Sequence, residues 1–290
     1  MPSPSTSRTA ERPLLNLTVA QLAYLVAVAD HDTFSDAAAS LGVSTSALSQ
    51  GLAELERRIG LSLFERMGRR QVLRDDALEV LAHARRVVAD TRDLGRWIES
   101  TNAGGTGRLR VGMIDAAAVA HFPEHIRTFR RAAPEVEMRL VVAPSGTLLE
   151  QVVRGDLDLA VVVEPERIPD EIEFEPLLDE QIVVVAPEGT EIGDPSTWGP
   201  WVLFPSGSHT RALIERELRA LGATVDVVAE SHQPEVLREM ARLGMGWTAL
   251  PVAAATTQGP GLGRRRLALA RRVGRSSHPA ADLFAAHLGA

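Results

Sequence analysis

The sequence predicts an α/β protein in two parts, a mostly helical first hundred residues and a larger part in which strands and helices alternate. Three observations support this fold class. Apolar residues recur at helical spacing up to about residue 102. The segment "TNAGGTGR", residues 101–108, is small and glycine-rich, as linkers are. From Arg108 onward, short apolar strands alternate with amphipathic helices.

Composition excludes several classes of protein. The chain of 290 residues has no cysteine, so it forms neither disulfides nor cysteine-ligated metal sites. Its first twelve residues are small and polar, without the apolar segment of a signal peptide, and we expect residues 1–16 to be a disordered tail. No run of eighteen apolar residues occurs. We therefore expect a cytoplasmic protein of about two domains without a membrane span.

Two short helices are predicted before Gly42. Thr18 and Gln21 form a capping-box pair at the start of the first helix. Gly42 stands where a helix commonly ends in a left-handed residue. The apolar faces are Leu22, Leu25, Val26 and Ala29 in the first helix and Phe34, Ala37, Ala38 and Leu41 in the second.

A third helix follows the tight turn at Gly42. Ser44 can cap it, and its apolar face is Leu48, Leu52, Leu55 and Ile59. In a helix-turn-helix the second helix of the pair lies in the major groove of DNA. The residues that would face the groove are Ser44, Thr45, Ser46, Ser49 and Gln50. On this pattern alone, an ordinary pair of packed helices remains an alternative.

A basic β-hairpin is predicted next. The segment "FERMGRRQVLR", residues 64–74, has two apolar–polar stretches around Met67-Gly68, and Arg69 and Arg70 at its tip would reach phosphates or the minor groove. Residues 57–74 contain six arginines and one acid. The net charge of −7 does not exclude such a basic surface, because salt screens charges beyond about 10 Å. The order helix, turn, helix, basic hairpin favours a winged helix-turn-helix over a simple helix pair.

Residues 75–102 are predicted to form one long helix, with Asp75 as its cap. Its apolar residues fall at alternating steps of four and three, as in a coiled-coil seam: Val80, Ala84, Val87, Thr91, Leu94 and Ile98. We expect this helix to dimerise the protein, and a dimer suits a two-fold-related DNA site. The alternative is that the seam packs against the chain's own second domain.

The part after Arg108 is predicted to be an open α/β fold, in which ligands bind at the carboxyl ends of strands. Three loops at such positions carry small or polar residues: Asp115 and Ala116, then Ser145, Gly146 and Thr147, then Ser208. They suit a polar or anionic small molecule, although serine and threonine are also ordinary helix caps. The segment "GPGLGRR", residues 259–265, reads as a surface turn.

Enzyme and metal motifs are weak in this chain. His121 and His125 are four residues apart, but Pro123 lies between them and no third ligand stands nearby, so we expect no metal site. No nucleophile elbow, Walker loop or dinucleotide fingerprint follows a strand, and we expect neither a cofactor nor an enzyme. We expect Trp198, Trp201 and Trp247 to belong to the core or to a cleft wall.

With these residues in view, the chain from Leu17 to Leu288 resembles the LysR-type transcriptional regulators. The resemblance is carried by three segments: "FSDAAASLGVSTSALSQGLAELERRIGLSLFER", "VVRGDLDLAVV" and "LREMARLGMGWTALP". Thr45 and Gly51 stand where the family commonly has longer polar residues. Residues 73–77, "LRDDA", replace the usual Leu-Thr-x-Ala-Gly after the wing.

The resemblance implies a dimeric or tetrameric regulator that binds double-stranded DNA and a small effector. Its domains would be a winged helix-turn-helix at residues 17–74, a dimerisation helix at 75–102, a hinge linker at 103–107 and a two-lobed, periplasmic-binding-protein-like effector domain at 108–290. The first lobe would comprise residues 108–163 and 270–290, and the second residues 164–269. The alternative is a small-molecule receptor of the periplasmic-binding-protein type without a DNA role.

Overall fold

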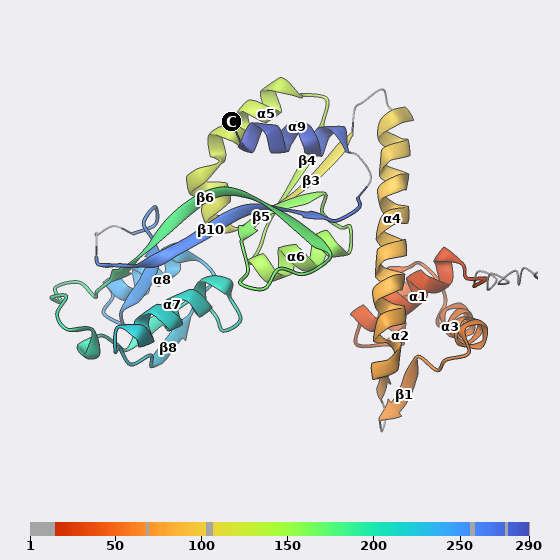
Figure 1. Ribbon diagram of the computed structural model, residues 1–290, viewed down its shortest axis with the longest axis horizontal. Coiled ribbons are helices and arrows are strands. Elements are labelled where there is room, and N and C mark those ends of the chain that lie inside the picture. Colours follow the sequence, from red (N-terminus) through yellow and green to blue (C-terminus); the bar gives the residue numbers. More distant parts are fainter. Residues whose placement is uncertain (1–14, 68–69, 103–106, 256–258, 276–277, 290) are drawn as a thin grey trace, which may run out of the picture. The chain divides into compact units, whose positions relative to one another are not determined.

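The computed structural model describes residues 15–67, 70–102, 107–255, 259–275 and 278–289 (Figure 1). It divides into two compact units, Met1–Thr91 and Arg92–Ala290. The division falls inside a long helix, α4 (Leu78–Asn102), whereas the linker predicted at 103–107 lies mostly outside the described residues. The predicted domain boundaries therefore remain a prediction. The predicted tail at 1–16 is described only at Leu15 and Asn16.

The first unit is a winged helix-turn-helix. Its elements are α1 (Val19–Asp30), α2 (Phe34–Ser40), α3 (Thr45–Ile59), β1 (Phe64–Met67), β2 (Arg70–Leu73), the short 3-10 turn η1 (Asp75–Ala77) and the start of α4. The capping box of Thr18 and Gln21 is formed, and Gly42 adopts a left-handed φ of 66°. The predicted apolar faces of α1, α2 and α3 meet in one core. The fold class expected for this part is confirmed.

Gly51 lets α1 and α3 pack closely. A Cβ atom built on Gly51 would lie 2.4 Å from the ring of Tyr24 on α1, so any side chain there would displace this ring. Gly51 therefore has a packing role, which explains why the chain lacks the longer polar residue at this position.

The wing is a tight hairpin. Strands β1 and β2 pair antiparallel, with Phe64 opposite Leu73 and Met67 opposite Arg70. The residues between the strands, Gly68 and Arg69, lie outside the described residues. After the wing, Asp75 does not cap the long helix as expected. It is the first residue of η1, and Arg74 at the N-cap position provides no side-chain cap but pairs with Asp76 at 3.0 Å.

The first half of the α4 seam belongs to the core of the DNA-binding unit. Ala84 is fully buried there, and Val80 and Val87 pack against the same core. Thr91, Leu94 and Ile98 are exposed in the single chain. The sequence predicted the whole seam to face a second chain, but Ala84 is already covered by its own domain.

The second unit is built on a mixed six-stranded sheet of order β4-β3-β5-β10-β6-β9 (Figure 1). Its elements up to the second lobe are β3 (Arg108–Met113), the π-helical turn η2 (Ala117–His121), α5 (Pro123–Ala132), β4 (Glu137–Val142), α6 (Ser145–Val153), β5 (Leu159–Val163) and β6 (Ile172–Val185). They are followed by η3 (Pro195–Thr197), β7 (Trp201–Leu203), α7 (His209–Ala220), β8 (Val227–Glu230), α8 (Pro234–Arg242), β9 (Thr248–Pro251), β10 (Gly261–Arg272) and α9 (Pro279–Leu288).

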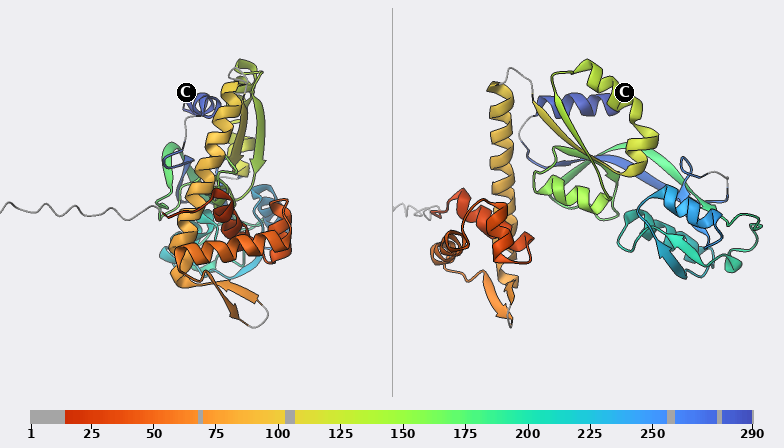
Figure 2. Two further views of the ribbon diagram at one scale, coloured as in Figure 1. Left: turned by 90° about the vertical axis from the view of Figure 1, so that its right-hand side faces the viewer. Right: turned by 180° about the vertical axis from the view of Figure 1, so that it is seen from behind.

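Two separate cores define two lobes in this unit. The first-lobe core lies around β3, β5, α6 and α9, and Figure 2 shows α5 and α9 side by side on it. The second-lobe core contains the three tryptophans 198, 201 and 247, as expected, with Trp198 stacked on Trp247 at 5.6 Å. The two-lobed fold class is confirmed.

The long strands β6 and β10 run antiparallel through both lobes. Ile172 of β6 lies in the first-lobe core, whereas Ile182 of the same strand lies in the second. The predicted surface turn at residues 259–265 was wrong, since β10 begins at Gly261. The chain therefore returns to the first lobe along β10, a strand that the sequence did not reveal. The lobe boundaries at 163 and 270 remain a prediction.

Candidate DNA-binding surface and effector cleft

The polar face of α3 is exposed. Ser44 caps this helix and accepts a hydrogen bond from the backbone N–H of Ala47 at 3.1 Å. The residues predicted to face the groove are all exposed: Ser44, Thr45, Ser46, Ser49 and Gln50. The apolar residues Leu48, Leu52 and Leu55 are buried on the opposite side of the helix. The structure therefore gathers the predicted contact residues on one accessible surface, and their contact with DNA remains a prediction.

Three of the six arginines at residues 57–74 form ion pairs within the domain. Arg57 and Arg58 both bind Glu54, each at 2.6 Å, and Arg74 binds Asp76. The hydrogen bonds from Arg57 and then Arg58 lower the pKa of Glu54 to about 2. The other three arginines of residues 57–74 are Arg66, Arg69 and Arg70 of the wing segment. Arg69 lies outside the described residues, and Arg70 is the first residue of β2.

The effector domain has a cleft between its lobes, a cavity of about 450 Å³. Every predicted effector-binding residue lines it: Asp115, Ala116, Ser145, Gly146, Thr147 and Ser208. The fold brings them together because the loops after β3 and β4 and the loop before α7 open on the same space. Their role in ligand binding remains a prediction.

Ser145 and Asp115 differ in the hydrogen bonds that they already form within the protein. The hydroxyl oxygen of Ser145 accepts a hydrogen bond from the backbone N–H of Val163 at 3.1 Å, and this hydroxyl donates none to the residues that the structure describes. Oδ1 of Asp115 is buried and accepts no hydrogen bond within the part of the chain that the structure describes. Burial, and then the nearby charge of Glu235, raise the pKa of the Asp115 carboxyl above its ordinary value.

A chain of buried polar groups underlies the cleft. Glu180 and Arg265 are 3% and 5% exposed, and the guanidinium donates to Oε2 of Glu180 from Nε at 2.8 Å and from Nη2 at 2.6 Å. Nη1 of Arg265 donates to the hydroxyl of Thr210 at 2.8 Å. On the other side, Nε2 of His121 lies 2.7 Å from Oε1 of Glu180. Burial lowers the pKa of Arg265, and the charge and hydrogen bonds of Glu180 oppose this lowering. The guanidinium is charged, as arginine side chains are in proteins.

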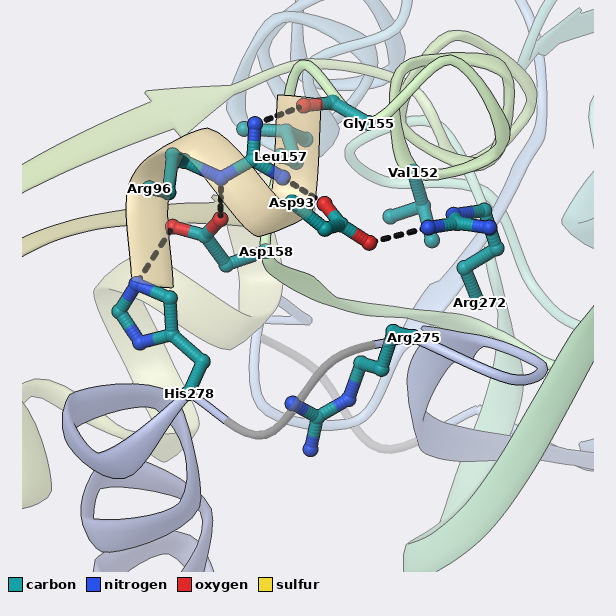
Figure 3. A pocket seen from close by; sticks show the side chains of 9 residues that line it. All are labelled: Asp93, Arg96, Val152, Gly155, Leu157, Asp158, Arg272, Arg275 and His278. Carbon is teal, nitrogen blue, oxygen red and sulfur yellow. Dashed lines mark hydrogen bonds and ion pairs between the residues drawn. The ribbon is translucent and has the colours of Figure 1, made fainter. Parts of the chain in front are cut away.

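A second buried charge cluster joins the end of α4 to the first lobe (Figure 3). Asp93 bonds both Arg96 and Arg272, and Arg96 donates to the carbonyl of Gly155 at 3.0 Å. Nε of Arg96 lies 3.2 Å from Oδ1 of Asp158, close enough for an ion pair though not aligned as a hydrogen bond. The last turns of α4 are therefore attached to the effector domain by ion pairs between mostly buried groups.

Sequence reasoning missed the arginine of the cleft floor. Arg265 lines the cleft, but it belongs to a segment that reads as a turn. His121, which the sequence suggested only as an unconvincing metal ligand, is instead the partner of Glu180. Among the described residues, no group of three or more histidine, aspartate or glutamate side chains is placed to hold a metal ion.

Two family models match the chain. Residues 102–290 match the LysR substrate binding domain, and residues 19–76 match the bacterial regulatory helix-turn-helix protein of the lysR family. The chain belongs to the LysR family of transcriptional regulators. It therefore combines a DNA-binding domain with an effector-binding domain, and the alternative of a small-molecule receptor without a DNA role is not favoured. No described helix has the length and apolar character that a bilayer crossing requires.

Individual relatives agree with this assignment. The RuBisCO operon transcriptional regulator of Allochromatium vinosum is 28% identical over 240 residues, which cover 80% of this chain and 78% of the relative. The regulator YfeR of Shigella flexneri is 27% identical, with 92% of both chains covered. The structure resembles full-length OxyR from Pseudomonas aeruginosa, with a TM-score of 0.63, 22% identity and coverage of 94% and 98%. CbnR, a LysR family regulator, gives 0.60 at 19% identity, with the same coverage.

Proposed function

We propose that this regulator binds a specific DNA site as a homodimer or homotetramer and that a small molecule bound between the lobes of its effector domain controls it. One observation supports the proposed choice of DNA-binding residues: the exposed polar face of α3 lies on the same domain as an arginine-rich hairpin. Ser46, Ser49 and Gln50 would read base edges, and Arg69 and Arg70 would hold phosphates or the minor groove.

The wing is tested by replacing Arg69 and Arg70 with alanine in the full-length protein. The expected result is weaker binding to all DNA sequences and a flatter dependence of affinity on salt, because each lost phosphate contact reduces the logarithmic salt slope by about 0.9. Two lost contacts reduce the slope by about 1.8. Fluorescence anisotropy with a genomic fragment, selected beforehand by footprinting bound chromosomal DNA, measures both quantities.

A matched control removes two arginines elsewhere. Arg127 and Arg131 are exposed on α5 of the effector domain, so their double alanine variant changes the net charge equally without touching the wing. The wing assignment is wrong if the Arg69/Arg70 variant keeps the affinity and slope of this control.

The effector cleft is tested with Ser145→Trp. Ser145 begins α6 at the cleft, and an indole there would occupy space that a ligand needs. We expect the variant to lose its transcriptional response to inducing growth conditions while its DNA affinity stays within about twofold, since the DNA-binding domain is unchanged. Ser196→Trp, at an exposed position of the same domain, is the control. An intact response in Ser145→Trp would remove this residue from the site.

Self-association would use the part of α4 that its own domains leave uncovered. Leu94 and Ile98 are 50% and 44% exposed, four residues apart on one helix. Pairing two such helices would bury these side chains and bring two α3 helices to a two-fold-related site. We further propose that the protein works in the cytoplasm, where bacterial chromosomes lie, and acts by binding and not by catalysis.

A further inference from the structure

The charge balance of the effector cleft indicates which kind of molecule it binds. Asp115 lies two residues after the end of β3 and contributes a carboxylate to the cleft. Its Oδ1 is buried and accepts no hydrogen bond from the described residues. A buried carboxylate oxygen without a donor is unfavourable, and natural proteins normally satisfy such an atom. The missing donor is therefore expected to come from the ligand.

The guanidinium of Arg265 at this site is already paired within the protein. Among the described residues that line the cleft, Arg265 is the one permanently charged cation. Its guanidinium is bound by both the carboxylate of Glu180 and the hydroxyl of Thr210, so its charge is neutralised within the protein. It is therefore unsuited to balance either Asp115 or an anionic ligand.

Further carboxylates add to the negative potential around Asp115. Glu150 lines the same cleft, and Glu235 on α8 is close enough to raise the pKa of Asp115. A dianionic ligand would bring two more negative charges into this space. A ligand with a protonated nitrogen would instead give Asp115 both a donor and an opposite charge.

The first turns of α6 and α7 supply a complementary feature. Both helices begin at the cleft, and neither Pro144 nor Ser208 at their starts provides a side-chain cap. Their free backbone N–H groups can receive acceptor atoms at another part of the same ligand. They do not substitute for the donor that Asp115 lacks, because Asp115 needs a hydrogen-bond donor and a positive charge.

We propose that the effector carries a protonated nitrogen, as a small amine or an amino acid does, and that Asp115 binds this group. The inference rests on the proposed function of the cleft. It differs from the anionic ligand that the hydroxyl-bearing loops suggest by themselves. The cavity of about 450 Å³ accommodates molecules of this size.

The test uses five-carbon compounds that differ mainly in charge: cadaverine, 5-aminopentanoate, L-norvaline and glutarate. Each is titrated into the full-length protein by isothermal calorimetry. We expect at least one of the three amines to bind, and glutarate to bind at least tenfold more weakly. Asp115→Asn should weaken amine binding at least tenfold, since it keeps the shape and removes the charge. Asp170→Asn, at an exposed position of the same domain, should leave it unchanged.

Three results would overturn the proposal: glutarate binding more tightly than every amine, amine affinity unchanged in Asp115→Asn, or no binding of any of the three amines. Ser145→Trp separates this failure from failure of the proposed function. If glutarate binds and Ser145→Trp abolishes its binding, the cleft still binds an effector and only the ligand class is wrong. DNA binding is measured independently through the wing variants.

Discussion

The buried pair of Glu180 and Arg265 makes a quantitative prediction about the stability of the effector domain. The two residues are cross-strand neighbours on β6 and β10, and their side chains are 1% and 4% exposed. Arg265→Met removes the guanidinium but keeps much of the side chain's length. Glu180 then loses two hydrogen bonds and remains buried, with His121 as its nearest partner.

The expected loss of stability follows from the uncompensated charge. Removing one member of a buried ion pair destabilises a protein by about 3–5 kcal/mol. Glu180 keeps its hydrogen bond with His121, so we expect a value near the lower end, about 3 kcal/mol. The double variant Arg265→Met/Glu180→Leu removes both charges. We expect it to lie within about 1.5 kcal/mol of the wild type, because an apolar pair of similar volume often replaces a buried ion pair without loss.

Urea unfolding followed by tryptophan fluorescence measures these values. Trp198, Trp201 and Trp247 lie in the second-lobe core and report on the domain that contains the pair. The reasoning predicts that the double variant is more stable than Arg265→Met by about 1.5 kcal/mol or more, and that the losses in Arg265→Met and in Glu180→Leu alone add up to more than the loss in the double variant. If the free-energy losses of the two single variants simply add in the double variant, the pair does not act as a coupled buried unit and the reasoning fails.

Two further predictions concern other ion pairs. Asp93→Ala should free the end of α4 from the first lobe, so that amides 92–102 exchange with deuterium on the order of tenfold faster. The amides of α7 should exchange as before. Unchanged protection of 92–102 would contradict the attachment seen around Asp93. The Glu54 carboxyl has a pKa of about 2, below the ordinary 4.5, so its stabilising effect is complete above pH 4.5 and is lost as the pH falls toward 2. In urea titrations at several pH values, the advantage of wild type over Glu54→Gln should therefore shrink below pH 4.5, and a pH-independent difference would refute this assignment.

Local sequence signals predicted the elements of the DNA-binding domain because its contacts are short in sequence. The cap at Thr18, the turn at Gly42 and the apolar face of α3 all depend on neighbours within a few residues. The pairing of Glu54 with Arg57 and Arg58 depends on the same kind of spacing, three and four residues along a helix. The ion pairs of Arg57 and Arg58 could thus have been expected from the sequence alone.

The strand β10 was missed for the opposite reason. Its start contains two glycines and three consecutive arginines, a composition typical of exposed turns. Arg265 can be buried there only because β6, 85 residues earlier in the chain, places Glu180 opposite it. A burial that depends on the partner strand and its register leaves no signal in a single sequence.

The effector cleft contains residues of both kinds, some predictable from their neighbours in sequence and one that depends on a distant strand. The loops that carry Asp115, Ser145 and Ser208 were predictable, since they follow strands or precede helices and the α/β fold gathers such loops at one edge. The floor formed by Arg265 was not predictable, yet it decides the electrostatics of the site. Glu180 neutralises Arg265 within the protein, whereas the carboxylates of Asp115 and Glu150 also line the cleft. If Asp115 binds a protonated nitrogen as proposed, selectivity for a ligand's charge depends on a single residue of a loop, and replacing it changes the class of effector without disturbing the buried pair beneath.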